Sequence, residues 1–254
     1  GCSTLVLIMD MFTRKQNLAA AFEFSNLTPD IRKHLVQVYG HLACTVAAGA
    51  VGSYLHLTMG IGHVVSGFIG LIAALGLMFG IMSMPNTPAN KMTRFAMLMG
   101  FGVLEGLIIG PLVEAVLEID PSIVVTAFVA TTAIFACFSV AALVAERRSY
   151  LFLGGILSSA LSFMLIISFF NMFFANQAIF NAQLYLGLLM FCGFVVFDTQ
   201  MVVEKVSLGD KDVVRHALEL FVDFVAIFVR ILILLSKDKK KKNNSSGRGG
   251  SSRR

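Results

Sequence analysis

The stretch AQLYLGLLMFCGFVVFDTQMVV at residues 182–203 is an apolar run that carries a single aspartate, Asp198, near its end. At 1.5 Å of rise per residue, a helix of this length can cross about 30 Å of hydrocarbon. Similar runs recur along the chain, and we expect the sequence to form an all-α, polytopic membrane bundle of about seven transmembrane helices. The predicted spans are 35–57, 61–84, 95–117, 122–144, 151–171, 182–203 and 217–235.

The composition supports this class, because 57% of the residues are hydrophobic and only 14% are charged, whereas soluble domains carry roughly a quarter charged residues. We divide the chain into a cytoplasmic N-terminal segment at 1–34, a membrane domain at 35–235 and a basic tail at 236–254. The tail offers almost nothing apolar to bury and is expected to be disordered. It is either a solvated anchor or a segment that binds anionic lipid headgroups.

Lys and Arg mark the cytoplasmic side of a membrane protein when they are counted over the short loops. The loops at 58–60, 118–121 and 172–181 contain no Lys or Arg, and the alternate loops all do. We therefore expect a cytoplasmic N-terminus. The basic residues that support this orientation are Arg14, Lys15, Arg32, Lys33, Lys91, Arg94, Arg147, Arg148, Lys205, Lys211 and Arg215.

The C-terminal tail conflicts with seven complete crossings. Seven crossings place the tail on the far side, yet residues 237–254 contain eight Lys or Arg against one Asp, which favours the cytoplasm. The seventh segment is also the most polar, because it contains Glu219, Asp223 and Arg230. A seventh segment that is central and crosses fully, and one that is re-entrant with a cytosolic tail, both remain open. Without the tail's net charge of +7 the rest of the chain carries −2, so the basic balance indicates no nucleic-acid partner.

Asp198 and Asp223 are the candidates for the functional residues, because ionisable groups inside a membrane are costly and usually functional. Asp198 lies five residues before the cytoplasmic end of its predicted helix, and Asp223 lies six residues into the next. Both are therefore roughly 8–9 Å deep. Two carboxylates at one depth are expected to share a proton and to titrate as a coupled pair. When ionised they offer the oxygen ligands that Ca²⁺ prefers, so proton and Ca²⁺ would compete for a transient site.

Other charged residues also lie inside the predicted spans. Glu219 and Arg230 share a helix face with Asp223 and are expected to support it, or to form an ion-pair ladder that only stabilises the bundle. Glu114, near the far end of the third span, is a candidate entrance carboxylate. Glu105 lies on the opposite face of that span and receives no role.

Small residues form a stripe in the third span. Gly102, Gly106 and Gly110 recur every four residues, which lets two helix backbones approach closely in lipid. Tight internal packing is the expected use of this stripe, with homodimerisation as the alternative.

No residue pattern indicates catalysis or a bound cofactor. The four cysteines and five histidines show no metal-ligand spacing, so a zinc site is not expected. Intramembrane aspartyl proteases also use two aspartates on neighbouring helices, but their Gly-x-Gly-Asp signature is absent. The nearest string, SLGD at 207–210, lies in a charged loop. We therefore expect no enzymatic reaction.

Several stretches resemble the transmembrane Bax inhibitor motif family, in its endoplasmic-reticulum branch. They are GPLVEAVLEIDPSIVVTAF at 110–128, RRSYLFLGGILSSALS at 147–162, LYLGLLMFCGFVVFDTQMVVEK at 184–205 and HALELFVDF at 216–224, with the Lys-rich end. The resemblance implies a seven-helix, pH-sensitive Ca²⁺ leak of the endoplasmic reticulum that protects against cell death and stress. It also implies that Asp198 and Asp223 match the family's di-aspartyl pH sensor. Bacterial relatives latch this pair with an Arg of the second helix, but residues 61–84 contain no Arg or Lys.

Three functions remain in competition. The first is the passive, proton-regulated Ca²⁺ leak, and the second is a Ca²⁺/H⁺ exchanger built on the same carboxylates. The third is a membrane scaffold that regulates anti-apoptotic Bcl proteins or stress sensors of the unfolded protein response through its loops and tail. Ca²⁺ and H⁺ are the expected ions, and membrane lipid and a second copy of the chain are further expected partners.

Overall fold

The computed structural model describes residues 28–65, 67–145 and 152–249, and all regular structure in these ranges is helical. This confirms the predicted all-α class. The predicted N-terminal residues 1–27, the loop residues Arg147 and Arg148, and residues 250–254 lie outside the described residues. The helices are α2 (Pro29–Met59), α3 (Gly62–Val65), α4 (Phe68–Ser83), α5 (Lys91–Leu117), α6 (Ser122–Val144), α7 (Leu153–Phe174), α8 (Gln177–Ser207) and α9 (Val213–Gly249).

Five of the described helices, α2, α5, α6, α7 and α8, are long and apolar enough to cross a membrane. The predicted span at 61–84 is instead divided into α3 and α4, because Gly67 adopts a left-handed φ of 102° between them. The 16-residue α4 is apolar but shorter than a full crossing. The last helix, α9, is not among the five, because Glu219, Asp223 and Arg230 interrupt its apolar sequence.

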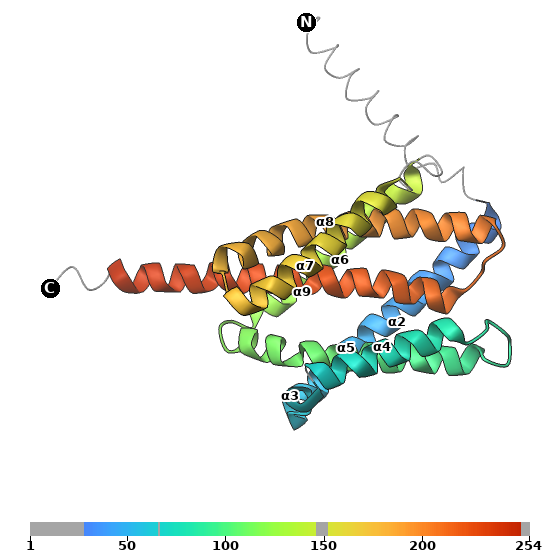
Figure 1. Cartoon of the computed structure of the whole chain (residues 1–254). Coiled ribbons are helices and arrows are strands. Elements are labelled where there is room, and N and C mark those ends of the chain that lie inside the picture. Colours follow the sequence, from blue (N-terminus) through green and yellow to red (C-terminus); the bar gives the residue numbers. More distant parts are fainter. Residues whose placement is uncertain (1–27, 66, 146–151, 250–254) are drawn as a thin grey trace, which may run out of the picture.

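Helix α9 lies in the middle of the bundle, where it packs against α8, α2, α6 and α5 (Figure 1). Its side chains make up much of the hydrophobic core, with Leu218, Leu220, Ile227 and Leu232 almost completely buried. The helix is continuous through this region. The last segment is therefore a central, continuous helix, and the side of the membrane on which its tail lies stays a prediction.

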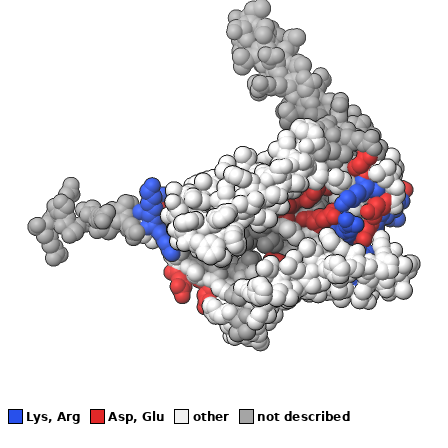
Figure 2. Space-filling view, viewed as in Figure 1, with Lys and Arg blue, Asp and Glu red and all other residues white. Residues whose placement is uncertain are grey.

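The surface of the bundle is apolar where a membrane would surround it. Helix α7 packs mainly against α8, and only Leu157 among its residues is buried. Most of its other large side chains, such as Phe163 and Phe169, are exposed, as expected for a helix that faces lipid. Figure 2 shows the charged side chains gathered at the two ends of the visible face, with acidic groups reaching from one end into a hollow.

The glycine stripe brings α2 and α5 into backbone contact. A methyl group added at Gly102 would lie 2.7 Å from the carbonyl oxygen of Thr45, and one added at Gly106 would overlap the carbonyl of Gly49. Gly110 leaves room for a side chain of α2 in the same way. The structure thus uses Gly102, Gly106 and Gly110 inside the chain, which is the first of the two uses considered for this stripe.

One end of the bundle is closed by a buried ion pair next to the α8–α9 turn at 208–212; we call this the hairpin end. Arg94, at the start of α5, is 1% exposed and donates to both carboxylate oxygens of Asp212 at 2.8 and 2.6 Å. It also donates to the carbonyl of Ile81 at 3.1 Å. Burial opposes the charged form of Asp212, but hydrogen bonds from Arg94 and from the backbone of Arg215 hold the pKa of Asp212 below its ordinary value.

At the opposite end, α9 projects beyond the other helices (Figure 1). Lys239 pairs with Asp120 at 2.7 Å, and Lys237 donates to Asn181 at 2.6 Å. The helix continues to Gly249, which differs from the disordered tail expected from residue 236. Lysine is a good helix former, and extending an existing helix requires no new nucleation. The basic segment therefore begins beside the loops that contain no Lys or Arg.

The α2–α5 crossing can be tested with two alanine substitutions in one helix. Gly106→Ala should lower stability by about 1–3 kcal/mol, because its methyl group meets backbone of α2 that cannot move aside cheaply. Gly100→Ala has open space around the new methyl group and should leave stability unchanged or slightly raised. Thermal unfolding of the purified protein in detergent measures both. Equal stability of the two variants would contradict the close crossing.

The buried Arg94–Asp212 ion pair, which we call the hairpin-end clamp, predicts that substitutions at its two residues have strongly coupled effects on stability. Arg94→Ala and Asp212→Asn should each destabilise the protein by about 3–5 kcal/mol, because each leaves a buried group without its partner. The double variant should lose much less than the sum. Because the pKa of Asp212 is lowered on folding, this stabilisation is complete above its ordinary pKa of about 3.9 and is lost as the pH falls through the lowered value. Additive losses in denaturation experiments would exclude the clamp.

Candidate functional site: a buried carboxylate pair

Helices α8 and α9 form an antiparallel hairpin that carries the two predicted aspartates. Helix α8 begins where the side chain of Asn176 accepts hydrogen bonds from the backbone of Ala178 and Ile179. It ends at a tight turn in which Gly209 takes a left-handed φ of 98°, a conformation that favours glycine. Because the turn is short, residues at equal distances from it face each other across the two helices. This local chemistry fixes the register of the hairpin.

Asp198 and Asp223 lie opposite each other in this register, with their side chains within hydrogen-bonding reach. Two ionised carboxylates only accept hydrogen bonds, so a hydrogen bond between them requires a proton on one of them. Asp223 is 4% exposed, and its Oδ2 has no hydrogen-bond partner among the described residues. The structure therefore brings together the pair that the depth argument selected, with one buried oxygen still able to take a proton or a cation.

A third carboxylate, Glu219, lies one helical turn nearer the hairpin end. Lys205 of α8 donates to both of its oxygens at 3.0 and 3.1 Å, and Arg215 donates to it at 3.3 Å. The charges of Glu219 and Lys205 both act on Asp198. These ion-paired side chains thus lie between the aspartate pair and the hairpin end.

Arg230 does not join this group. It lies two turns farther along α9, where its guanidinium is 4.4 Å from the ring centre of Phe191 and donates to the carbonyl of Ala226. Among the described residues it forms no ion pair with a carboxylate. The predicted ladder of Glu219, Asp223 and Arg230 is therefore replaced by pairing across the hairpin, from α9 to α8. The described residues of α4 likewise contribute no basic latch to the pair.

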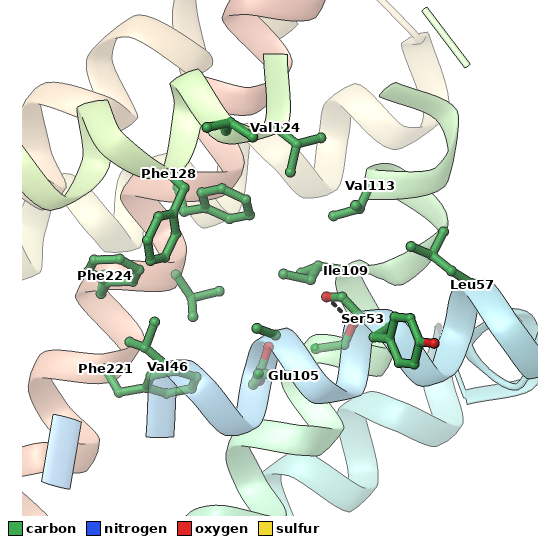
Figure 3. A pocket seen from close by; sticks show the side chains of 17 residues that line it. Val46, Ser53, Leu57, Glu105, Ile109, Val113, Val124, Phe128, Phe221 and Phe224 are labelled. Atoms are coloured by element: carbon green, nitrogen blue, oxygen red, sulfur yellow. Dashed lines mark hydrogen bonds between the residues drawn. The ribbon is translucent and has the colours of Figure 1, made fainter. Parts of the chain in front are cut away.

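The two glutamates of α5 have separate surroundings, as their spacing predicted. Glu105 lines an apolar cavity of about 400 Å³ between α2, α5, α6 and α9. Figure 3 shows this cavity with Phe128, Phe224 and Ile109 around it. Glu114 lies at the end of the bundle opposite the hairpin, within 3.0 Å of His56.

Sequence reasoning missed several contacts that connect distant segments. His34 and His216 share a hydrogen bond of 3.0 Å although they are 182 residues apart. The Arg94–Asp212 pair likewise joins segments 118 residues apart. Histidine spacing within one helix could not reveal the His34–His216 contact between two helices. Arg94 was the one signal in the sequence, because a basic residue at the start of an apolar helix indicates a buried acidic partner.

These features define a polytopic helical membrane protein with two adjacent carboxyl groups inside it. Residues 31–240 match the family model described as "Inhibitor of apoptosis-promoting Bax1". The chain is 46% identical to Bax inhibitor 1 of Mus musculus over 233 residues, which cover 90% of this chain and 95% of that protein. It is 44% identical to the Bos taurus protein of that name, over 90% of this chain and 96% of the relative.

The similarity extends to plants, with 45% identity to Bax inhibitor 1 of Arabidopsis thaliana over 85% of both chains. The family model covers the whole of the predicted membrane domain at 35–235. This chain belongs to the Bax inhibitor family.

Proposed function

We propose that this protein is a pH-sensitive Ca²⁺ leak of the endoplasmic-reticulum membrane that lowers luminal Ca²⁺ and suppresses apoptosis. The close approach of the buried carboxyl groups of Asp198 and Asp223 is the observation that carries the proposal. Family membership supports the anti-apoptotic role, since the matching family and relatives are named as Bax inhibitors. The resemblance of the FDTQ and last-helix motifs to a di-aspartyl sensor supports the ion pathway.

The pair acts as a proton-operated contact between α8 and α9. With one proton shared, a hydrogen bond holds the two helices together at this depth. Loss of the proton leaves two negative charges in a low-dielectric interior, where they repel each other and attract a hard cation. Ca²⁺ and protons therefore compete for the same oxygens, so the apparent affinity for Ca²⁺ falls as the pH falls.

Three further charged side chains support the proposed switch and pathway. Glu219 is ion-paired with Lys205 and Arg215, and its charge acts on both aspartates. Arg230 lies beyond the pair along α9, with its guanidinium over the ring of Phe191. Glu114 is the entrance carboxylate at the other end of the bundle.

The leak is tested by Ca²⁺ flux into liposomes that contain the purified chain, between about pH 6 and 8. Wild-type flux should depend on pH, by at most about tenfold per unit for one shared proton. Asp198→Asn and Asp223→Asn should each flatten that dependence, because neither variant has two carboxyls to share a proton. In the wild type the Ca²⁺ concentration for half-maximal flux should rise as the pH falls.

Asp238→Asn is the matched control, because Asp238 is an exposed aspartate on the same helix. It should retain the wild-type pH profile. An unchanged pH profile in both aspartate variants would assign the pH dependence to groups outside this pair. No flux above that of empty liposomes at any pH would reject the leak.

The same assay separates a leak from a Ca²⁺/H⁺ exchanger. A leak dissipates a Ca²⁺ gradient in the same direction whatever proton gradient is imposed. An exchanger moves Ca²⁺ against its own gradient when a proton gradient drives it. We expect dissipation only.

A scaffold that regulates anti-apoptotic Bcl proteins or endoplasmic-reticulum stress sensors makes the opposite prediction in cells. The projecting basic end of α9 is the observation that favours it, because this end lies outside the bundle (Figure 1). Removal of residues 240–254 keeps the Lys239–Asp120 pair and deletes most of the tail's positive charge. For the leak, we expect protection from cell death to survive this truncation and to be lost in Asp198→Asn. The reverse result would favour the scaffold.

A further inference from the structure

A second group of ligand-type side chains lies at the end of the bundle opposite the hairpin. His56 comes from α2, His63 from α3 and Glu114 from α5. The Nε2 atoms of the two histidines lie 3.0 and 3.3 Å from the same carboxylate oxygen of Glu114. One ligand atom from each of the three residues falls within 4.8 Å of the others. Three segments that are separate in the sequence thus direct their donor atoms at one point.

His56 is held in a fixed orientation by two positions that only glycine can occupy. A methyl group at Gly110 would lie 2.5 Å from the His56 ring, and one at Gly62 would overlap its Nδ1 atom. The His56 side chain is fully buried, and its Nδ1 has no hydrogen-bond partner among the described residues. The ring is therefore clamped with Nε2 facing Glu114, before any ion arrives.

The other two residues leave the site open to solvent. The side chains of His63 and Glu114 are 63% and 43% exposed. An ion can therefore reach the buried Nε2 of His56 from outside, and water can occupy the remaining coordination positions. Sites with three protein ligands and an open position are common for zinc and related ions.

We propose that His56, His63 and Glu114 form a binding site for a divalent transition-metal ion, of which Zn²⁺ is the best match. Two imidazoles with one carboxylate suit Zn²⁺, Ni²⁺ or Cu²⁺, whereas Ca²⁺ requires a shell of oxygens. The site is therefore chemically distinct from the aspartate pair. A bound ion joins α2, α3 and α5 and occupies Glu114, so it stabilises this end of the bundle and withdraws the carboxylate from any other cation.

Metal content and calorimetry of the full-length protein test this site without reference to ion flux. The protein is purified in detergent, stripped with a chelator, treated with a thiol-blocking reagent and titrated with Zn²⁺ near neutral pH. We expect one saturable Zn²⁺ per chain and a higher unfolding temperature when the ion is bound. Co²⁺ should give the visible absorption of a four- or five-coordinate ion.

His63→Ala and Glu114→Gln should each weaken the affinity at least about tenfold, because loss of a direct ligand costs no less than loss of an outer-shell partner. Both residues are partly exposed, so both variants are expected to fold. Glu118→Gln removes an exposed carboxylate one turn along the chain, and His41→Ala removes a histidine elsewhere on α2. These two controls should retain wild-type binding.

Absence of saturable Zn²⁺ binding would overturn the proposal, as would equal binding by the wild type and by both ligand variants. Loss of binding in the Glu118→Gln or His41→Ala control would also overturn it, since the ion would then be bound elsewhere. Because the readouts are stoichiometry, affinity and unfolding temperature, failure of the Ca²⁺ leak proposal would leave this result unaffected.

Discussion

The structure depends on the cost of placing charged side chains in hydrocarbon. Helix α9 carries Glu219, Asp223 and Arg230, each of which would cost several kcal/mol if it faced lipid at mid-depth. The helix is stable only because α8, α2, α6 and α5 surround it and supply partners. The apolar surfaces of helices such as α7 can then face outward, where a water-soluble protein would place its charges. The bundle is thus arranged around its most polar helix.

Close packing of the surrounding helices makes this burial possible. Gly102 and Gly106 remove side chains from the α2–α5 contact, so the two backbones meet directly. Arg94 then fastens the start of α5 to Asp212 in the turn before α9. Because lipid is as apolar as the helix surfaces, shape and polar contacts drive this association more than the hydrophobic effect. The same glycine spacing that brings α2 and α5 together also leaves room for His56.

The two ends of the bundle differ in their chemistry. Near the hairpin end, Asp198 and Asp223 offer only oxygen atoms, which bind protons and hard cations. At the opposite end, His56 and His63 add nitrogen donors to Glu114, which favours softer divalent ions. A cation that crossed the protein would meet both groups. Regulation by a transition metal at one end and by protons at the other would then act on the same pathway.

Much of the fold could be predicted from the sequence, because its signals are local. The apolar run around Asp198 predicted a membrane helix, and equal distances from the α8–α9 turn placed Asp198 and Asp223 at one depth. Boundaries were less predictable: the span at 61–84 is divided at Gly67, and α9 stays helical past residue 236. The average composition of a segment predicted neither boundary. One was set by the backbone conformation of Gly67, and the other by the extension of an existing helix.

By itself, the sequence determined the helical membrane class, the family, and the aspartates that share a hairpin, since each of these follows from length, polarity and short-range spacing. Only the tertiary structure decided which distant residues meet. Helix spacing could not reveal that His56 and His63 face Glu114, or that His34 reaches His216. Such contacts depend on how helices cross, and crossing is set by interlocking shapes, such as the glycine stripe against α2, that no single segment encodes.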